Sequence, residues 1–140
     1  MIKQISVFLE NKTGALGEVV KFMAENNVNL RALSIADTED FGILRIITDD
    51  PDSSIEKIKN AGYSAKLTNV LAVEIDDKPG SFSKIVDVLS NEGISIEYTY
   101  AFLSKKADRA YIIIRADNSE KASELLKKSG ITVSQQQDLF

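Results

Sequence analysis

Two short polar loops hold the residues whose types suit the binding of a small anion. They read Asn11-Lys12-Thr13-Gly14 and Asp77-Lys78-Pro79-Gly80, and each lies between an alternating apolar run and a helical pattern. The start of a helix exposes about four backbone N–H groups and the positive end of the helix dipole, and glycine lets a ligand come close. The further glycines and the lysine of a G-x-x-x-x-G-K-[ST] phosphate loop are missing. A carboxylate is therefore the anion that we expect.

The same loops also have a purely structural interpretation. A glycine or a Pro-Gly pair before a helix is common turn chemistry, and one such loop would favour that interpretation. Two loops at matching positions make ligand binding about as credible as a turn, so both interpretations stay open at this point.

Other chemistry finds little support in the composition. The chain has no cysteine and no histidine, which removes thiol and Ser–His nucleophiles, thiolate zinc sites and imidazole ligands. The acidic run at residues 49–53 is better explained by turn and cap chemistry than by a metal loop. Asp76 and Asp77 are neighbours on a predicted strand and would point to opposite faces. We expect no catalytic residues, no metal site and no cofactor.

Charge and hydropathy argue against two classes of partner. The net charge is −4 with mixed signs, whereas nucleic-acid binding needs a basic face. Gly14-Ala15-Leu16-Gly17 has the G-x-x-G form of a KH loop, but it follows a strand and lacks basic flanks. No apolar run reaches the roughly 18 to 20 residues of a membrane helix, and the N-terminus enters a strand pattern at once. We therefore expect no nucleic acid, no membrane and a cytoplasmic location.

The strands and helices that must position the loops occur in the same order in both halves of the chain. The stripe Leu16, Val19, Val20 and Met23 marks one face of a helix, and Phe82, Ile85, Val86 and Leu89 repeat it 66 positions later (16 to 82). In each half an alternating strand precedes that helix, and two strands, a second helix and a last strand follow it. In the first half, the S-x-x-E pattern at residues 53–56 predicts the start of the second helix, which stops at Gly62. Residues 63–68 and 70–75 are expected to be separate strands.

The repeat predicts an α+β fold of two ferredoxin-like β-α-β-β-α-β domains. Each domain would have an antiparallel sheet with its helices on one face. We place the first domain at residues 1–69 and the second at residues 70–140. No Pro/Gly/Ser-rich linker separates them, and domains this small gain stability by packing side by side.

The order of elements and the loops resemble the ACT domain, a regulatory module of amino-acid metabolism. The segment Lys78-Pro79-Gly80-Ser81-Phe82 matches the D-x-P-G-x-L-type first loop of that family, and Gly14-Ala15-Leu16 matches its G-A-L triplet. In the first half, Asn11 and Thr13 replace the acidic residue and the proline. Asn29-Leu30 matches a position where a side-chain amide meets the ligand. The likeness covers nearly the whole chain and is that of a stand-alone tandem ACT protein.

The resemblance implies an amino-acid ligand, apolar or aromatic, held at an interface between domains. The N–H groups of residues 14–16 would hold its α-carboxylate, Asn29 or a strand carbonyl would accept from its α-ammonium, and apolar residues would line the side-chain pocket. Ser95 replaces Asn29 in the second half, so the second loop is expected to bind less strongly. The expected ligand-binding residues are Asn11, Lys12, Thr13, Gly14, Ala15, Leu16, Asn29, Leu30, Asp77, Pro79, Gly80, Ser81, Phe82, Ser95 and Ile96.

We therefore expect a non-enzymatic regulatory protein in which the ligand changes domain packing, and an enzyme of amino-acid metabolism as the partner that responds. The strands at residues 29–36 and 95–103 would be open sheet edges unless paired, which predicts a homodimer. The alternative is a module of the same fold that binds no ligand and serves only for interaction and oligomerisation.

Overall fold

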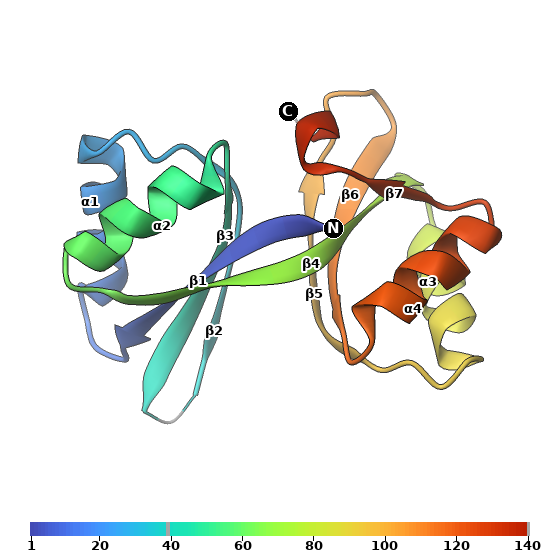
Figure 1. Ribbon diagram of the computed structural model, residues 1–140, viewed down its shortest axis with the longest axis horizontal. Coiled ribbons are helices and arrows are strands. Elements are labelled where there is room, and N and C mark those ends of the chain that lie inside the picture. The colour runs from blue at the N-terminus through green and yellow to red at the C-terminus, as the bar shows by residue number, and fades with distance from the viewer. Residues whose placement is uncertain (39, 140) are drawn as a thin grey trace. The chain divides into compact units, whose positions relative to one another are not determined.

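The computed structural model describes residues 1–38 and 40–139 (Figure 1). The chain forms two compact units. One comprises Lys3–Thr68, and the other comprises Met1–Ile2 with the chain from Asn69 onward. The boundary falls inside a single strand, β4 (Ser64–Asp76).

The unit Lys3–Thr68 is a β-α-β-β-α-β fold. Strand β3 (Phe41–Thr48) pairs antiparallel with both β1 (Ile2–Glu10) and β2 (Leu30–Asp37), with Ile5 opposite Ile46 and Leu33 opposite the same residue, and β4 lies next to β1. Its elements are β1 (Ile2–Glu10), α1 (Ala15–Glu25), β2 (Leu30–Asp37), β3 (Phe41–Thr48), α2 (Pro51–Asn60) and β4 (Ser64–Asp76).

The second unit repeats this plan. Strand β4 pairs antiparallel with both β6 (Arg109–Ala116) and β7 (Thr132–Ser134), with Val73 opposite Ile112 and Val133, and β5 (Ile96–Leu103) pairs with β6 at the edge. Its further elements are α3 (Ser81–Ser90), β5 (Ile96–Leu103), β6 (Arg109–Ala116), α4 (Ser119–Lys128), β7 (Thr132–Ser134) and the 3₁₀ helix η1 (Gln136–Asp138). The prediction of two ferredoxin-like α+β units with antiparallel strands and four helices is confirmed.

Each unit has its own apolar core. In the first, Val19 and Met23 of α1 pack with Ile5, Leu44 and other buried strand residues. In the second, Ile85 and Leu89 of α3 pack with their counterparts on β4 and β6. The helical spacing of the apolar residues therefore buries one face of each helix against its sheet. No helix among the described residues is long and apolar enough to cross a membrane.

Two element boundaries differ from the sequence prediction. Helix α2 begins at Pro51, before the predicted capping box at residues 53–56, because the Asp50 side chain accepts from the Ser53 N–H at 3.2 Å and proline suits the first helical position. The predicted strands at residues 63–68 and 70–75 are one continuous strand, β4. No glycine or proline interrupts residues 64–76, so nothing in the chain ends the strand there.

Candidate ligand-binding loops

The loops before α1 and α3 have nearly the same backbone geometry. Gly14 has φ 89° and ψ −12°, and Gly80 has φ 90° and ψ −16°. The N–H of Lys12 donates to the Glu10 carbonyl at 2.9 Å, and that of Lys78 donates to the Asp76 carbonyl at 3.0 Å. The N–H of the first helical residue, Ala15 or Ser81, donates to the carbonyl of Lys12 or Lys78 at 3.3 Å in both loops. The repeat seen in the sequence is therefore a repeat of conformation.

Backbone conformation alone accounts for the two glycines. Both lie in the left-handed region, which L-residues with a Cβ rarely adopt. A Cβ built on either glycine would meet no heavy atom within 4 Å, so space does not demand glycine there. The glycines by themselves thus leave both interpretations of the loop open.

The helix starts separate the loops from ordinary turns. Helices α2 and α4 are capped by side chains: Asp50 accepts from the Ser53 N–H, and Asn118 accepts from the Lys121 N–H at 3.1 Å. Helices α1 and α3 begin after Gly14 and Gly80, which provide no side-chain cap. In the described residues, the loop bonds use the Ala15 N–H and leave those of Gly14 and Leu16 without a partner within the chain. These donors are available to a ligand or to water.

The first loop borders a small cavity of about 180 Å³ against the β2–β3 hairpin. Asn11, Lys12, Ala15 and Leu16 line it, so the structure brings these four predicted site residues together. The hairpin contributes Ile35, which is 49% exposed, and Leu16 on the helix is 41% exposed. Apolar side chains thus lie open beside the uncapped helix start.

Polar contacts tie this loop to its surroundings. The Asn11 amide Nδ2 donates to the Thr38 carbonyl at 3.3 Å, which joins the loop to the hairpin. The Lys12 ammonium lies 2.9 Å from a Glu10 carboxylate oxygen, and this hydrogen bond raises the pKa of Lys12 above its ordinary value. Thr13 is exposed in the turn.

Asn29 and Leu30 lie at the other end of α1. This helix has 11 residues and is therefore about 16 Å long, and both residues follow its C-terminal end. The Asn29 amide donates to Asp49 at 2.8 Å, and Arg31 also binds that carboxylate. A single unit does not bring Asn29 to the Gly14 loop. Ser95 and Ile96 occupy the corresponding place after α3, where the Ser95 N–H donates to Asp117 at 3.2 Å.

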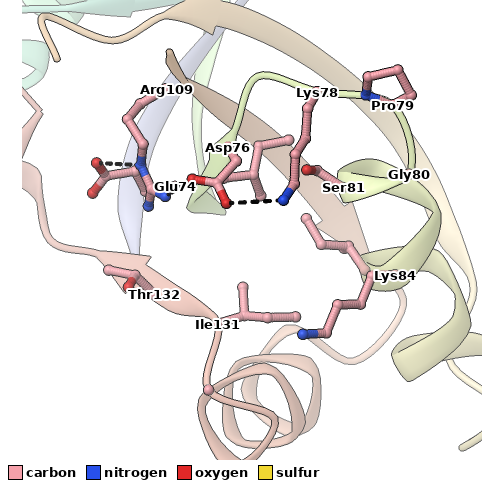
Figure 2. Close-up of a pocket in the computed structure, with 13 residues that line it drawn as sticks. Glu74, Asp76, Lys78, Pro79, Gly80, Ser81, Lys84, Arg109, Ile131 and Thr132 are labelled. Atoms are coloured by element: carbon pink, nitrogen blue, oxygen red, sulfur yellow. Dashed lines mark hydrogen bonds and ion pairs between the residues drawn. The ribbon is translucent and has the colours of Figure 1, made fainter. Parts of the chain in front are cut away.

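The second loop borders a larger cavity of about 300 Å³, shown in Figure 2. Pro79, Gly80 and Ser81 line it, whereas Asp77 and Phe82 of the predicted site lie exposed outside the lining. The Asp77 N–H donates to the Asp108 carbonyl at 2.7 Å and fixes the loop to the β5–β6 turn.

The sequence analysis did not identify three of the charged residues in this cavity, Glu74, Lys84 and Arg109. Arg109 lies opposite Asp76 in the β4–β6 register and binds both that carboxylate and Glu74, the latter at 3.2 Å. These contacts, with Asp76 first, raise the pKa of Arg109 above its ordinary value. Only the strand register connects residues so distant in the sequence. Among the described residues, no three potential metal ligands cluster.

Comparison with known proteins gives consistent matches. The model of the ACT domain pair family matches residues 1–140. Protein BT0572 from Bacteroides thetaiotaomicron, a solved structure, is 40% identical with a TM-score of 0.89, over 98% of this chain and 94% of that one. The ligand-free regulatory subunit of aspartate kinase from Thermus thermophilus shares the fold, with a TM-score of 0.64 at 17% identity over 90% and 91% of the two chains.

One curated relative is similar in sequence. The acetolactate synthase small subunit of Buchnera aphidicola subsp. Baizongia pistaciae is 31% identical over 117 residues, which cover 81% of this chain and 72% of that protein.

Proposed function

This chain belongs to the ACT domain pair family, a family of regulatory domains, and from that premise we propose that it is an amino-acid-responsive regulatory protein. The first loop would bind the α-carboxylate of a free amino acid through the N–H groups of Gly14 and Leu16, which have no partner among the described residues. The second loop would provide a weaker site of the same kind. The protein would act by regulation and not by catalysis.

The contrast between capped and uncapped helices is the observation that carries this proposal. The chain caps α2 and α4 with Asp50 and Asn118 but leaves the starts of α1 and α3 without a side-chain acceptor. Compared with a glycine N-cap, a side-chain cap contributes only about a few tenths of a kcal/mol, so the omission costs little stability while it leaves backbone donors open at two matching places. A ligand carboxylate would supply the missing acceptor and would also interact favourably with the helix dipole.

The side chains beside the first loop favour an apolar or aromatic amino acid. Leu16 and Ile35 line the adjoining cavity and are largely uncovered. Covering them with the ligand side chain would remove apolar surface from water, at about 25 cal/mol for each Å². Lys12 and Glu10 pair with each other, and Asp37 also lines this cavity, so its charged side chains carry one net negative charge.

The relatives suggest the kind of partner. One is the small subunit of acetolactate synthase, and a protein of the same fold is the regulatory subunit of aspartate kinase. We propose that this chain likewise regulates an enzyme of amino-acid biosynthesis. The ligand can control that enzyme only if the bound and empty forms of the chain differ in affinity for it, because coupling between two sites is reciprocal.

The alternative is a ligand-free interaction module. It is favoured by the left-handed conformation of Gly14 and Gly80, which explains both glycines without a ligand. The two functions differ in one measurable property, since only the first predicts that a free amino acid stabilises the protein.

The variant Ala15→Asp tests the proposed site. Ala15 is the first residue of α1, where the dipole favours a negative side chain, so the empty variant should be as stable as the parent. Its carboxylate would lie about 4 Å from the ligand carboxylate, a repulsion of about 1–4 kcal/mol at effective dielectric constants of 80 to 20. We expect a roughly five- to thousandfold loss of affinity in calorimetry with the amino acid that best stabilises the parent.

Ser119→Asp provides the matched control. Ser119 is the first residue of α4, so this variant adds the same charge at the same helical position away from both loops, and it should bind like the parent. Ser81→Asp, at the first residue of α3, tests the second loop and should have the smaller effect. Parent-like affinity in Ala15→Asp would reject the first loop as the binding site.

A further inference from the structure

The two units carry the same cavity with different charges. In each unit it lies between the end of the first strand, the start of the first helix and the turn after the second helix. The first, of about 340 Å³, includes Glu10, Lys12, Glu18 and Tyr63. The second, of about 300 Å³, is the cavity of Figure 2. The two halves of the chain thus contain cavities at equivalent places with different linings.

In the first cavity the helix contributes an acid. Glu18 lies beside Tyr63, whose hydroxyl has a pKa raised by burial and then by the Glu18 carboxylate. Lys12 pairs with Glu10 at 2.9 Å. The two acids therefore outnumber the single cation, and this cavity disfavours anions.

In the second cavity the corresponding helical residue is a base. Lys84 lies 66 positions after Glu18 (18 to 84) and occupies its place. Ile131 follows Gly130 as Tyr63 follows Gly62, so the phenol of the first cavity is replaced by an apolar side chain. Figure 2 shows the side chains of Lys78 and Lys84 both extending into the cavity. Among the described residues, none forms an ion pair with Lys84, and Lys78 lies 3.9 Å from Asp76, at the limit of pairing.

The acids of the second cavity are already neutralised. Glu74 is buried and binds Arg109 at 3.2 Å and Lys106 at 3.4 Å, and Asp76 also binds Arg109. Three cationic side chains line this cavity against two acids, and Lys106 neutralises part of the acidic charge from outside the lining. The Lys84 ammonium is therefore left for a ligand, and Lys78, which shares Asp76 with Arg109, is held only by a 3.9 Å pair. The hydroxyl-bearing residues Ser81 and Thr132 complete the polar lining.

We propose that the second cavity binds a small organic dianion, with acidic groups of the carboxylate or phosphate type, and that the first does not. Two ammonium groups favour a ligand with two negative charges, and the volume is at the small end of ligand pockets, which suits a compact metabolite. This inference does not rest on amino-acid binding by the first loop. Because Pro79, Gly80 and Ser81 line the cavity, a dianion bound there would compete with the weaker amino-acid site proposed for the second loop.

Calorimetric titration of the full chain with succinate tests the proposal, with inorganic phosphate to distinguish the acid type and butyrate as the monoanion of equal length. We expect at least one of the two dianions, succinate or phosphate, to bind at one site per chain. If succinate binds, butyrate should bind about tenfold more weakly, because it carries one negative charge fewer. Lys84→Glu should lower the affinity for the dianion by about tenfold or more, because it reverses a charge beside the ligand. Residue 84 lies on an exposed face of α3, and the first unit has a glutamate, Glu18, at the corresponding place. The fold should therefore be retained in this variant.

Lys21→Glu is the matched control, since it changes the net charge equally on an exposed residue of α1, outside either cavity. It should leave the affinity within about twofold of the parent.

The response of melting temperature to amino acids should persist in Lys84→Glu, which separates this site from the first loop. Three results would overturn the proposal: no dianion binding to the parent at about 10 mM, parent-like binding in Lys84→Glu, or an equal loss in Lys21→Glu.

Discussion

Gly14 and Gly17 lie three residues apart, but replacing them by alanine should change the stability of the protein in opposite directions. Gly14 has φ 89°, whereas Gly17 lies within α1 with no atom near the place of a Cβ. Gly14→Ala should lower the free energy of unfolding by about 1–2 kcal/mol, because alanine is strained in the left-handed region. Gly17→Ala should raise it by about 0.5–1 kcal/mol through helix propensity. Urea denaturation measures both, and equal signs would contradict the loop geometry.

Residue types at the two loops could be predicted from sequence better than the cavities around them. The loop glycines, the lysines and the helix starts follow from local patterns that need no tertiary information. Lys84 and Arg109 depend instead on helical phase and on the register between β4 and β6, which the sequence does not specify. The grouping of Asn29 with Gly14 came from the family resemblance, and within one unit the length of α1 separates them.

At the scale of the elements, the side-chain cap of α2 can be tested directly. Asp50→Ala removes the acceptor for the Ser53 N–H and should destabilise the protein by about 1 kcal/mol. Asp52→Ala makes the same charge change in the first turn but loses only an exposed ion pair with Lys3, so it should cost less, about 0–1 kcal/mol. Thermal unfolding of both variants compares them, and a larger loss in Asp52→Ala would contradict the cap assignment.

Periodicity predicted the existence and order of the elements but not all of their ends. The capping box at residues 53–56 was wrong because Asp50-Pro51 begins the helix earlier, and two start signals so close together cannot be ranked from sequence alone. Strand β4 was split in the prediction because each half was expected to have its own strands. The domain boundary between residues 69 and 70 stays a prediction.

At the scale of the whole molecule, we predict a homodimer. Strand β2 pairs with β3 on one side and is an edge strand, and Leu33 and Ile35 on it are 56% and 49% exposed. Such an apolar edge is usually covered by another chain. Light scattering at micromolar concentration should give twice the 15.4 kDa chain mass, and Leu33→Lys should reduce it. A monodisperse parent of 15.4 kDa would contradict this prediction.

The central claim is that a free amino acid binds this chain, and a thermal unfolding series with the common amino acids at millimolar concentration tests it most directly. At a free concentration of 100 times Kd, binding adds about 2.7 kcal/mol, which should raise Tm by several degrees. We predict that an apolar or aromatic amino acid raises Tm, while a divalent metal ion or an oligonucleotide leaves it unchanged. A Tm that no amino acid moves would contradict the claim and favour the ligand-free interaction module.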